Sequence, residues 1–154
     1  MSDKKLSFVS FEFKDGSFRP FVSLESFIGD NADWEVELQK ASVIYEKAIN
    51  TMRSIITEIE NIRRSGLLTP ARKVWQIGDS IFKLTEQLED LSLQITNLYD
   101  HLVRDLNVKR KWLEKAIIFR RYLPKERFIP KDLNWGKCEK GTRKIAENLR
   151  KEYH

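Results

Sequence analysis

The chain has 154 residues, of which 41% are hydrophobic and 33% are charged, and its formal net charge is +5. This composition excludes an intrinsically disordered chain and supplies enough apolar residues for one domain with a buried core. The single cysteine, Cys138, excludes an intrachain disulfide and favours a reducing compartment. No apolar run reaches the ~20 residues that a membrane span needs, and the N-terminus lacks a signal-peptide core. We therefore expect a cytoplasmic protein with no membrane partner.

The charge is unevenly distributed along the chain. Residues 1–99 contain 12 Lys and Arg against 15 Asp and Glu, a net of −3, whereas residues 100–154 contain 16 against 8, a net of +8. A basic C-terminal third on a slightly acidic body indicates a polyanionic partner. The alternative is a thermophile-like surface rich in Lys, Glu and Arg, which would explain the high charge but not its segregation.

Residues 1–28 are predicted to form an N-terminal β-hairpin appendage. Phe11 and Phe13 precede the turn dipeptide Asp-Gly at residues 15–16, and Phe18 follows it. An isolated hairpin is marginal in water, so we expect its aromatic face to pack on the rest of the chain or on a second copy.

Residues 29–154 are predicted to form a helical domain whose first helix covers about 32–64. Apolar residues recur there in alternating steps of four and three, which is the heptad seam of a coiled-coil-like helix. The seam residues are Trp34, Leu38, Ala41, Tyr45, Ala48, Met52, Ile55, Ile59 and Ile62.

A short break follows, in which Gly66 is suited to end the first helix, and Thr69 and Pro70 to start the next. The second helix is predicted over about 70–106. Its seam residues are Val74, Ile77, Ile81, Leu84, Leu88, Leu91, Ile95, Leu98 and Leu102. Two matched seams joined by a short loop predict a long antiparallel helical hairpin, whose seams close within one chain or between two chains in a homodimer.

A basic helical cap is predicted over 107–154, with one helix ending before Pro124 and a last helix over about 141–152. The start of this cap fits a helix-turn-helix-like pattern. Asn107 would take the left-handed turn position, which Asn tolerates better than most residues, and Leu113 would be buried in the second helix. The alternative is a helix with a charged, solvated face.

If the cap binds nucleic acid, its exposed cations are the candidate contacts. They are Lys109, Arg110, Lys111, Lys115, Arg120, Arg121, Lys137, Lys140, Arg143 and Lys144. Such contacts would be to phosphates, which position the protein without specifying sequence. Trp112 could stack on a base, but a Trp on such a helix is more often a packing residue.

Motifs for catalysis are mostly absent. The two histidines, His101 and His154, and the cysteine have no zinc-ligand spacing, and no glycine-rich phosphate loop or nucleophile elbow occurs. Residues 12–14 form an acid-x-Lys pattern of the kind found in metal-dependent nucleases, but only Asp3 precedes it as an acidic ligand. We therefore expect no catalytic residue, no metal and no cofactor.

Four short segments between Val74 and Lys137 resemble parts of one known domain. They are VWQIGDSI, LYDHLVRDL, FRRYLP and LNWGK. These segments resemble the helical N-terminal domain of the YhcG-like family of bacterial nuclease-related proteins. The resemblance implies a helical module associated with DNA. The PD-(D/E)XK nuclease half of that family does not follow here, and Trp112 stands where the family usually has Asn, so the resemblance does not imply an enzyme.

Together these patterns predict a mainly α protein with a long antiparallel helical hairpin, a basic helix-turn-helix-like cap and an N-terminal β-hairpin. The leading functional hypothesis is a non-catalytic module that binds nucleic acid, with DNA ahead of RNA. The alternative is a protein-interaction or assembly subunit that acts through its heptad seams and its Phe-rich hairpin.

Overall fold

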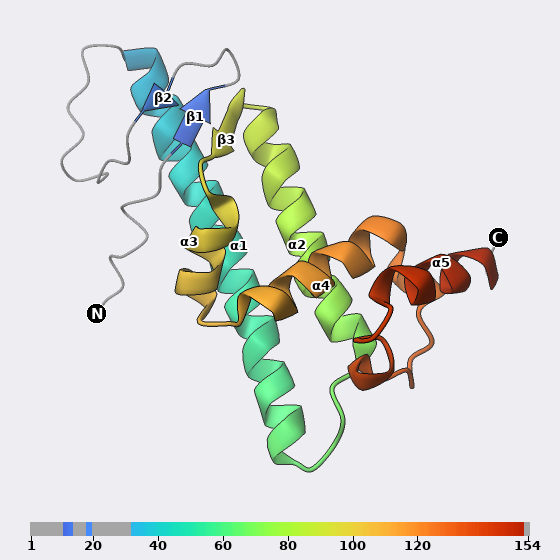
Figure 1. Ribbon diagram of the computed structural model, residues 1–154. Coiled ribbons are helices and arrows are strands. Elements are labelled where there is room, and N and C mark those ends of the chain that lie inside the picture. The colour runs from blue at the N-terminus through green and yellow to red at the C-terminus, as the bar shows by residue number, and fades with distance from the viewer. Residues whose placement is uncertain (1–10, 14–17, 20–31, 153–154) are drawn as a thin grey trace. The chain divides into compact units, whose positions relative to one another are not determined.

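The computed structural model describes residues 11–13, 18–19 and 32–152, and side chains from residue 36 (Figure 1). The chain is mainly helical, as predicted. The elements in chain order are β1 (Phe11–Phe13), β2 (Phe18–Arg19), α1 (Ala32–Arg64), α2 (Ala71–Glu89), β3 (Leu93–Ile95), α3 (Leu98–Leu106), α4 (Arg110–Tyr122), the short 3-10 helices η3 (Glu126–Phe128) and η4 (Trp135–Lys137), and α5 (Thr142–Glu152).

The chain forms two compact units that alternate along the sequence. Unit 1 combines the residues up to 50 with residues 83–107, and unit 2 combines residues 51–82 with the residues from 108 onward. The helices α1 and α2 therefore each contribute one part to each unit. All the candidate contact residues of the basic cap belong to unit 2.

Helix α1 confirms the predicted helix over 32–64. Six of the predicted seam residues are buried: Leu38, Ala41, Tyr45, Met52, Ile55 and Ile59. In the middle of the helix, however, Ile49 is buried and the predicted Ala48 is partly exposed. A straight α-helix has 3.6 residues per turn, so its buried side drifts by about 20° per heptad and moves on to the next residue.

Helix α1 ends at Arg64, and Gly66, the residue that the sequence predicted to end it, follows two positions later. This glycine has a φ of +83°, which favours a residue without a Cβ. The amide of Gly66 donates to the carbonyl of Arg63 at 3.0 Å, and the amide of Leu67 donates to that of Ile62 at 3.2 Å. These two bonds form a Schellman motif, which satisfies carbonyls that the helix end would otherwise leave without partners.

The predicted second helix over 70–106 is wrong beyond residue 89. The structure divides this range into α2, β3 and α3, and Leu91 of the predicted seam is only partly buried outside any helix. Ser92 and Asn97 have φ values of 60° and 57°, which interrupt a right-handed helix on both sides of β3. Between them Leu93 and Ile95 are buried and Gln94 is exposed, which is the period of a strand.

In unit 1, the strands form a sheet in the order β2-β1-β3. Strand β1 pairs antiparallel with β2, with Phe11 opposite Arg19, and antiparallel with β3, with Phe13 opposite Leu93. Strand β3 thus finds a partner that lies about eighty residues earlier in the sequence. The remainder of the predicted 1–28 segment, including its turn, lies outside the described residues.

In unit 2, the first part of α2 packs closely against α4. The indole Nε1 of Trp75 donates to the carbonyl of Leu123 at 2.6 Å. Phe119 of α4 contacts Trp135 of η4 edge to face, with ring centroids 5.4 Å apart. Helix α5 then packs against α4. The buried face of α4 is therefore held from several sides, and this fixes which of its side chains face solvent.

Candidate nucleic-acid interface

Helix α4 carries five of the ten cations that the sequence singled out. Its buried residues are Leu113, Ala116, Ile117 and Phe119. At 3.6 residues per turn, the cations on the opposite side of the helix lie along one arc. Together with the residue before the helix they define the α4 basic face: Lys109, Arg110, Lys111, Lys115 and Arg121. Trp112 is partly buried beside the core, which is the position expected of a packing residue.

The entry to α4 matches the expected turn conformation. Asn107 has φ 55° and ψ 51°, the left-handed conformation predicted for it. Its amide donates to the carbonyl of Val103, so it closes α3. Lys109 then stands at the N-cap in an extended conformation, without a side-chain hydrogen bond to the helix.

The first turn of α4 is electrostatically unfavourable for the isolated protein. A helix N-terminus carries a partial positive charge, and acidic residues or capping oxygens normally stabilise it. Here the first turn has no acidic residue, and it contains Arg110 and Lys111 directly after Lys109. The ion pair between Arg110 Nε and Glu114 Oε2, at 3.2 Å, is exposed and offsets only a small part of this charge. Lys109 and Lys111 are exposed.

Helix α5 brings a second group of predicted cations. Gly141, with a φ of +73°, precedes it, and the Thr142 hydroxyl donates to the carbonyl of Cys138 at 2.7 Å. In its first turn the guanidinium of Arg143 lies 4.5 Å from the centre of the Tyr122 ring and pairs with Glu147 at 3.3 Å. Arg143 therefore keeps an exposed charge in a defined position next to the end of α4.

Three further predicted contacts are also exposed: Lys137, Lys140 and Lys144. Lys137 lies on η4, whose start is capped because the Lys137 amide donates to Asn134 Oδ1 at 3.2 Å. Lys140 lies just before α5, and Lys144 in its first turn.

Arg120 differs from the other predicted contacts, because its side chain is mostly buried and ion-paired. Its side chain is only 20% exposed, and its Nε donates to Asp79 Oδ1 at 2.9 Å. Its guanidinium also lies 4.5 Å from the centre of the Phe82 ring. Arg120 thus connects α4 to α2 inside unit 2, and its charge is neutralised there, so we remove it from the set of contact residues.

The net charges of the two units differ more than the net charges of residues 1–99 and 100–154 do. Unit 2 contains 20 Lys and Arg against 9 Asp and Glu, a net of +11, whereas unit 1 contains 8 against 14, a net of −6. The cations of the first part of α2 and the last part of α1 thus belong with the basic cap.

Unit 1 contains a buried carboxylate that sequence reasoning missed. Asp105 of α3 accepts a 2.6 Å hydrogen bond from the hydroxyl of Tyr45 on α1, and Arg104 Nε lies 3.1 Å from its other oxygen. One signal was present: Asp105 follows Leu102 by three residues and therefore shares its face of the helix. We interpret the Tyr45–Asp105 bond as a structural tie between α3 and α1.

His101 and Cys138 are two further ionisable residues whose pKa values are shifted by burial. Burial, followed by the nearby charge of Arg104, lowers the pKa of His101 below its ordinary value, which favours a neutral imidazole. Burial raises the pKa of the Cys138 thiol from 9.0 to about 11, so this thiol stays protonated and poorly nucleophilic near neutral pH. Across residues 36–152, no cluster of three or more His, Cys, Asp or Glu side chains could hold a metal ion.

Across the part of the chain that the structure describes, no helix combines the length and apolar character needed to cross a membrane. No protein-family model, curated protein or solved structure matches this chain.

Proposed function

We propose that this protein is a non-catalytic nucleic-acid-binding module that contacts the phosphates of DNA through the α4 basic face. The observation that carries the proposal is the start of α4, where three consecutive cations meet the positive end of the helix without an acidic residue or a side-chain cap. Each misplaced charge costs about 0.3–1 kcal/mol in the isolated protein. A bound phosphate would reverse this penalty, because helix amides and cations both attract it.

The other helices that begin in unit 2 support this proposal. Helices α2 and α5 also have no acidic residue in their first turns, which contain the adjacent pairs Arg72-Lys73 and Arg143-Lys144. In α2 these charges have partners, because Lys73 pairs with Glu58 at 2.7 Å and Arg72 Nε donates to the carbonyl of Ile129. We therefore assign phosphate contacts to the α4 basic face, and to Lys137, Lys140, Arg143 and Lys144, rather than to α2.

A finer architecture goes with this function. In it, α3, Asn107 and α4 form a helix-turn-helix-like pair, α1 and α2 form a long antiparallel hairpin as the scaffold, and β1 and β2 belong to an N-terminal β-hairpin. The left-handed conformation of Asn107 and the complete burial of Leu113 support the first part. The resemblance to the helical domain of the YhcG-like family points to the same association with DNA.

The test is binding to a fluorescent 20-base-pair duplex, measured by anisotropy over a series of salt concentrations. The logarithm of the association constant should fall linearly with the logarithm of salt, by about 0.9 per phosphate neutralised. The variant Lys109→Glu/Lys111→Glu should bind more weakly and reduce the steepness of this dependence by about 1.8, the share of two phosphates.

The matched control is Lys40→Glu/Lys47→Glu, which reverses two exposed lysines on α1 in unit 1 and changes the net charge by the same amount. It should keep most of the affinity. If both variants lose affinity equally, the attraction is net charge alone and the α4 basic face is not a site. If the wild-type protein does not bind near physiological salt, the basic face is only a solvated surface.

A second candidate function is assembly through helix α1. Val36 and Val43 are each 47% exposed and lie seven residues apart, so they form an apolar stripe outside the buried seam. A homodimer or a protein partner could cover this stripe. Light scattering would then detect an oligomer that persists in high salt, and Val36→Ser/Val43→Ser would dissociate it.

A further inference from the structure

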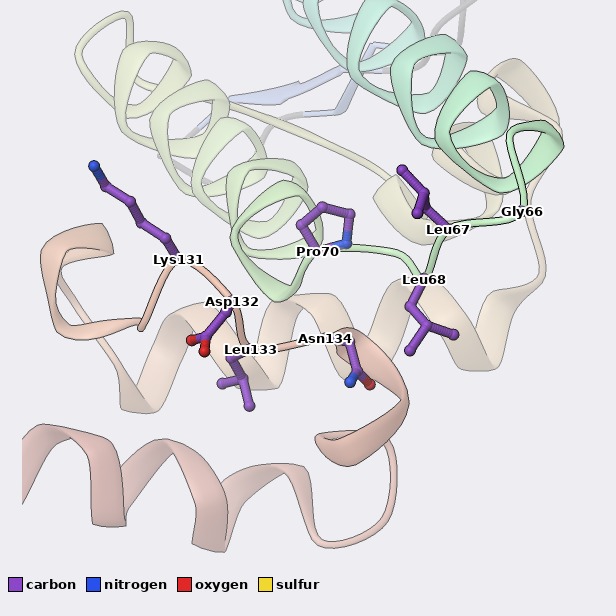
Figure 2. Close-up of a pocket in the computed structure, with 8 residues that line it drawn as sticks. All are labelled: Gly66, Leu67, Leu68, Pro70, Lys131, Asp132, Leu133 and Asn134. Atoms are coloured by element: carbon purple, nitrogen blue, oxygen red, sulfur yellow. The ribbon is translucent and has the colours of Figure 1, made fainter.

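Unit 2 contains a pocket between two loops, near the N-terminal end of α2. Figure 2 shows the two segments that form it, one joining α1 to α2 and the other preceding η4. The pocket has a volume of about 370 Å³. Its lining residues are Gly66, Leu67, Leu68, Pro70, Lys131, Asp132, Leu133 and Asn134.

Backbone hydrogen bonds hold the two walls together. The amide of Ala71 donates to the carbonyl of Leu133 at 2.9 Å, and the amide of Trp135 donates to the carbonyl of Thr69 at 2.7 Å. Pro70 and Asn134 form an antiparallel bridge between them. The first wall is also anchored to α1 by the Schellman motif at Gly66. A ligand would therefore find the pocket already formed, which reduces the entropic cost of binding.

The pocket carries two large apolar side chains that face solvent. Leu67 is 64% exposed and Leu68 is 71% exposed. Leu67 follows the C-terminal glycine of α1, where an apolar residue commonly contacts the helix. Leu68 has no such local explanation. In Figure 2 the side chains of Leu68 and Leu133 extend to the same side of the two loops.

The surroundings of the pocket are positive. Lys131 lines it, Arg63 and Arg64 lie in the last turn of α1 just before Gly66, and Lys137 follows Asn134 by three residues. Among the lining residues Asp132 is the one carboxylate. A ligand that complements this surface therefore combines an apolar group with negative charge.

We propose that this pocket binds a short acidic peptide segment of a partner protein, with one apolar side chain as its anchor beside Leu68 and Leu133. The lining contains no aromatic residue. Nucleic-acid bases need such a residue to stack on, so a peptide fits this pocket better than a single strand does. The pocket is a second binding surface, distinct from the α4 basic face and independent of its proposed role.

The experiment is a selection from a phage-displayed library of random dodecapeptides on the immobilised full-length protein. The library is first depleted on the variant Leu67→Ser/Leu68→Ser. Both leucines are exposed, so this variant should fold normally, which a thermal melt verifies. Enriched peptides should share one large apolar residue flanked by Asp or Glu.

The strongest enriched peptide is then synthesised, labelled and titrated in solution. Leu67→Ser/Leu68→Ser and Lys131→Glu should each weaken its binding by about tenfold, as expected for central contacts of an interface. The control Lys40→Glu makes the same charge change as Lys131→Glu at an exposed lysine of α1 and should leave the affinity within about twofold. Affinity should also fall as salt is raised.

The same variants are also titrated with the 20-base-pair duplex. Under the proposal, Leu67→Ser/Leu68→Ser leaves duplex binding unchanged. The proposal is overturned if no acidic peptide is enriched, or if the control variant loses peptide affinity to the same extent. It is also overturned if the leucine variant loses duplex binding instead, since Leu67 and Leu68 would then be a nucleic-acid contact. Loss of duplex binding by Lys109→Glu/Lys111→Glu bears only on the α4 basic face.

Discussion

At the scale of single residues, Gly78 lies at a close approach of α2 to α4. A Cβ at this position would lie 2.4 Å from the carbonyl oxygen of Ala116 and 2.8 Å from the Cβ of Arg120. Both distances are shorter than real Cβ contacts, and the first involves backbone that a side-chain rotation cannot relieve. The absence of a side chain at Gly78 thus allows the packing that orients the α4 basic face.

We predict that Gly78→Ala destabilises the protein by about 1–3 kcal/mol, as overpacked core sites do, although Ala is the better helix former. Urea denaturation monitored by circular dichroism measures this change. Gly136→Ala is the control, because its new Cβ would meet only the side chain of Asn134, at 3.2 Å. If Gly78→Ala were as stable as the wild type, this result would contradict the close packing of α2 against α4 at Gly78.

The exposure of individual cations was predictable only where it depends on local periodicity. Lys109, Arg110 and Lys111 follow from the apolar spacing of α4, and their exposure could be deduced from the sequence. Arg120 could not, because Asp79, its partner, lies 41 residues away and is brought close by tertiary packing. Asp105 was missed for the same reason, since Tyr45 precedes it by 60 residues.

At the scale of elements, the segment from Leu91 to Ile95 shows how one pattern can fit two structures. Leu91 and Ile95 continue the steps of three and four in α2, but Leu91, Leu93 and Ile95 also alternate with polar residues as in a strand. What decides between these structures is β1, whose pairing with β3 is a long-range contact. The helices α1 and α5, which contain no such ambiguity, were predicted to within one residue.

We predict that Leu93→Ala costs about 2–5 kcal/mol of stability, because Leu93 is only 1% exposed and its truncation leaves a cavity. Leu91→Ala should cost clearly less, since Leu91 is partly exposed. Chemical denaturation of the two variants in parallel gives the comparison. A larger loss for Leu91→Ala would indicate a helix that continues through this segment, as the heptad pattern had suggested.

At the scale of the whole molecule, the two units carry opposite net charges although both are assembled from separated parts of the sequence. A count along the chain therefore understates the segregation, because the acidic residues 83–107 are inserted between two basic parts. A polyanion should be attracted by the +11 of unit 2 and repelled by the −6 of unit 1. Both the long-range attraction of a polyanion and its local contacts with the α4 basic face would then favour unit 2.

This arrangement predicts where DNA slows hydrogen exchange. In the presence of saturating 20-base-pair duplex, amides at the start of α4 and α5 should exchange more slowly, because phosphates bound there shield and stabilise the helix ends. Amides of α3 and β3 in unit 1 should keep their exchange rates. Mass spectrometry of peptic fragments with and without duplex measures both sets in one sample. Equal protection of the two units would mean that DNA stabilises the whole fold rather than contacting one unit, whereas protection confined to unit 1 would contradict a charge-directed interface.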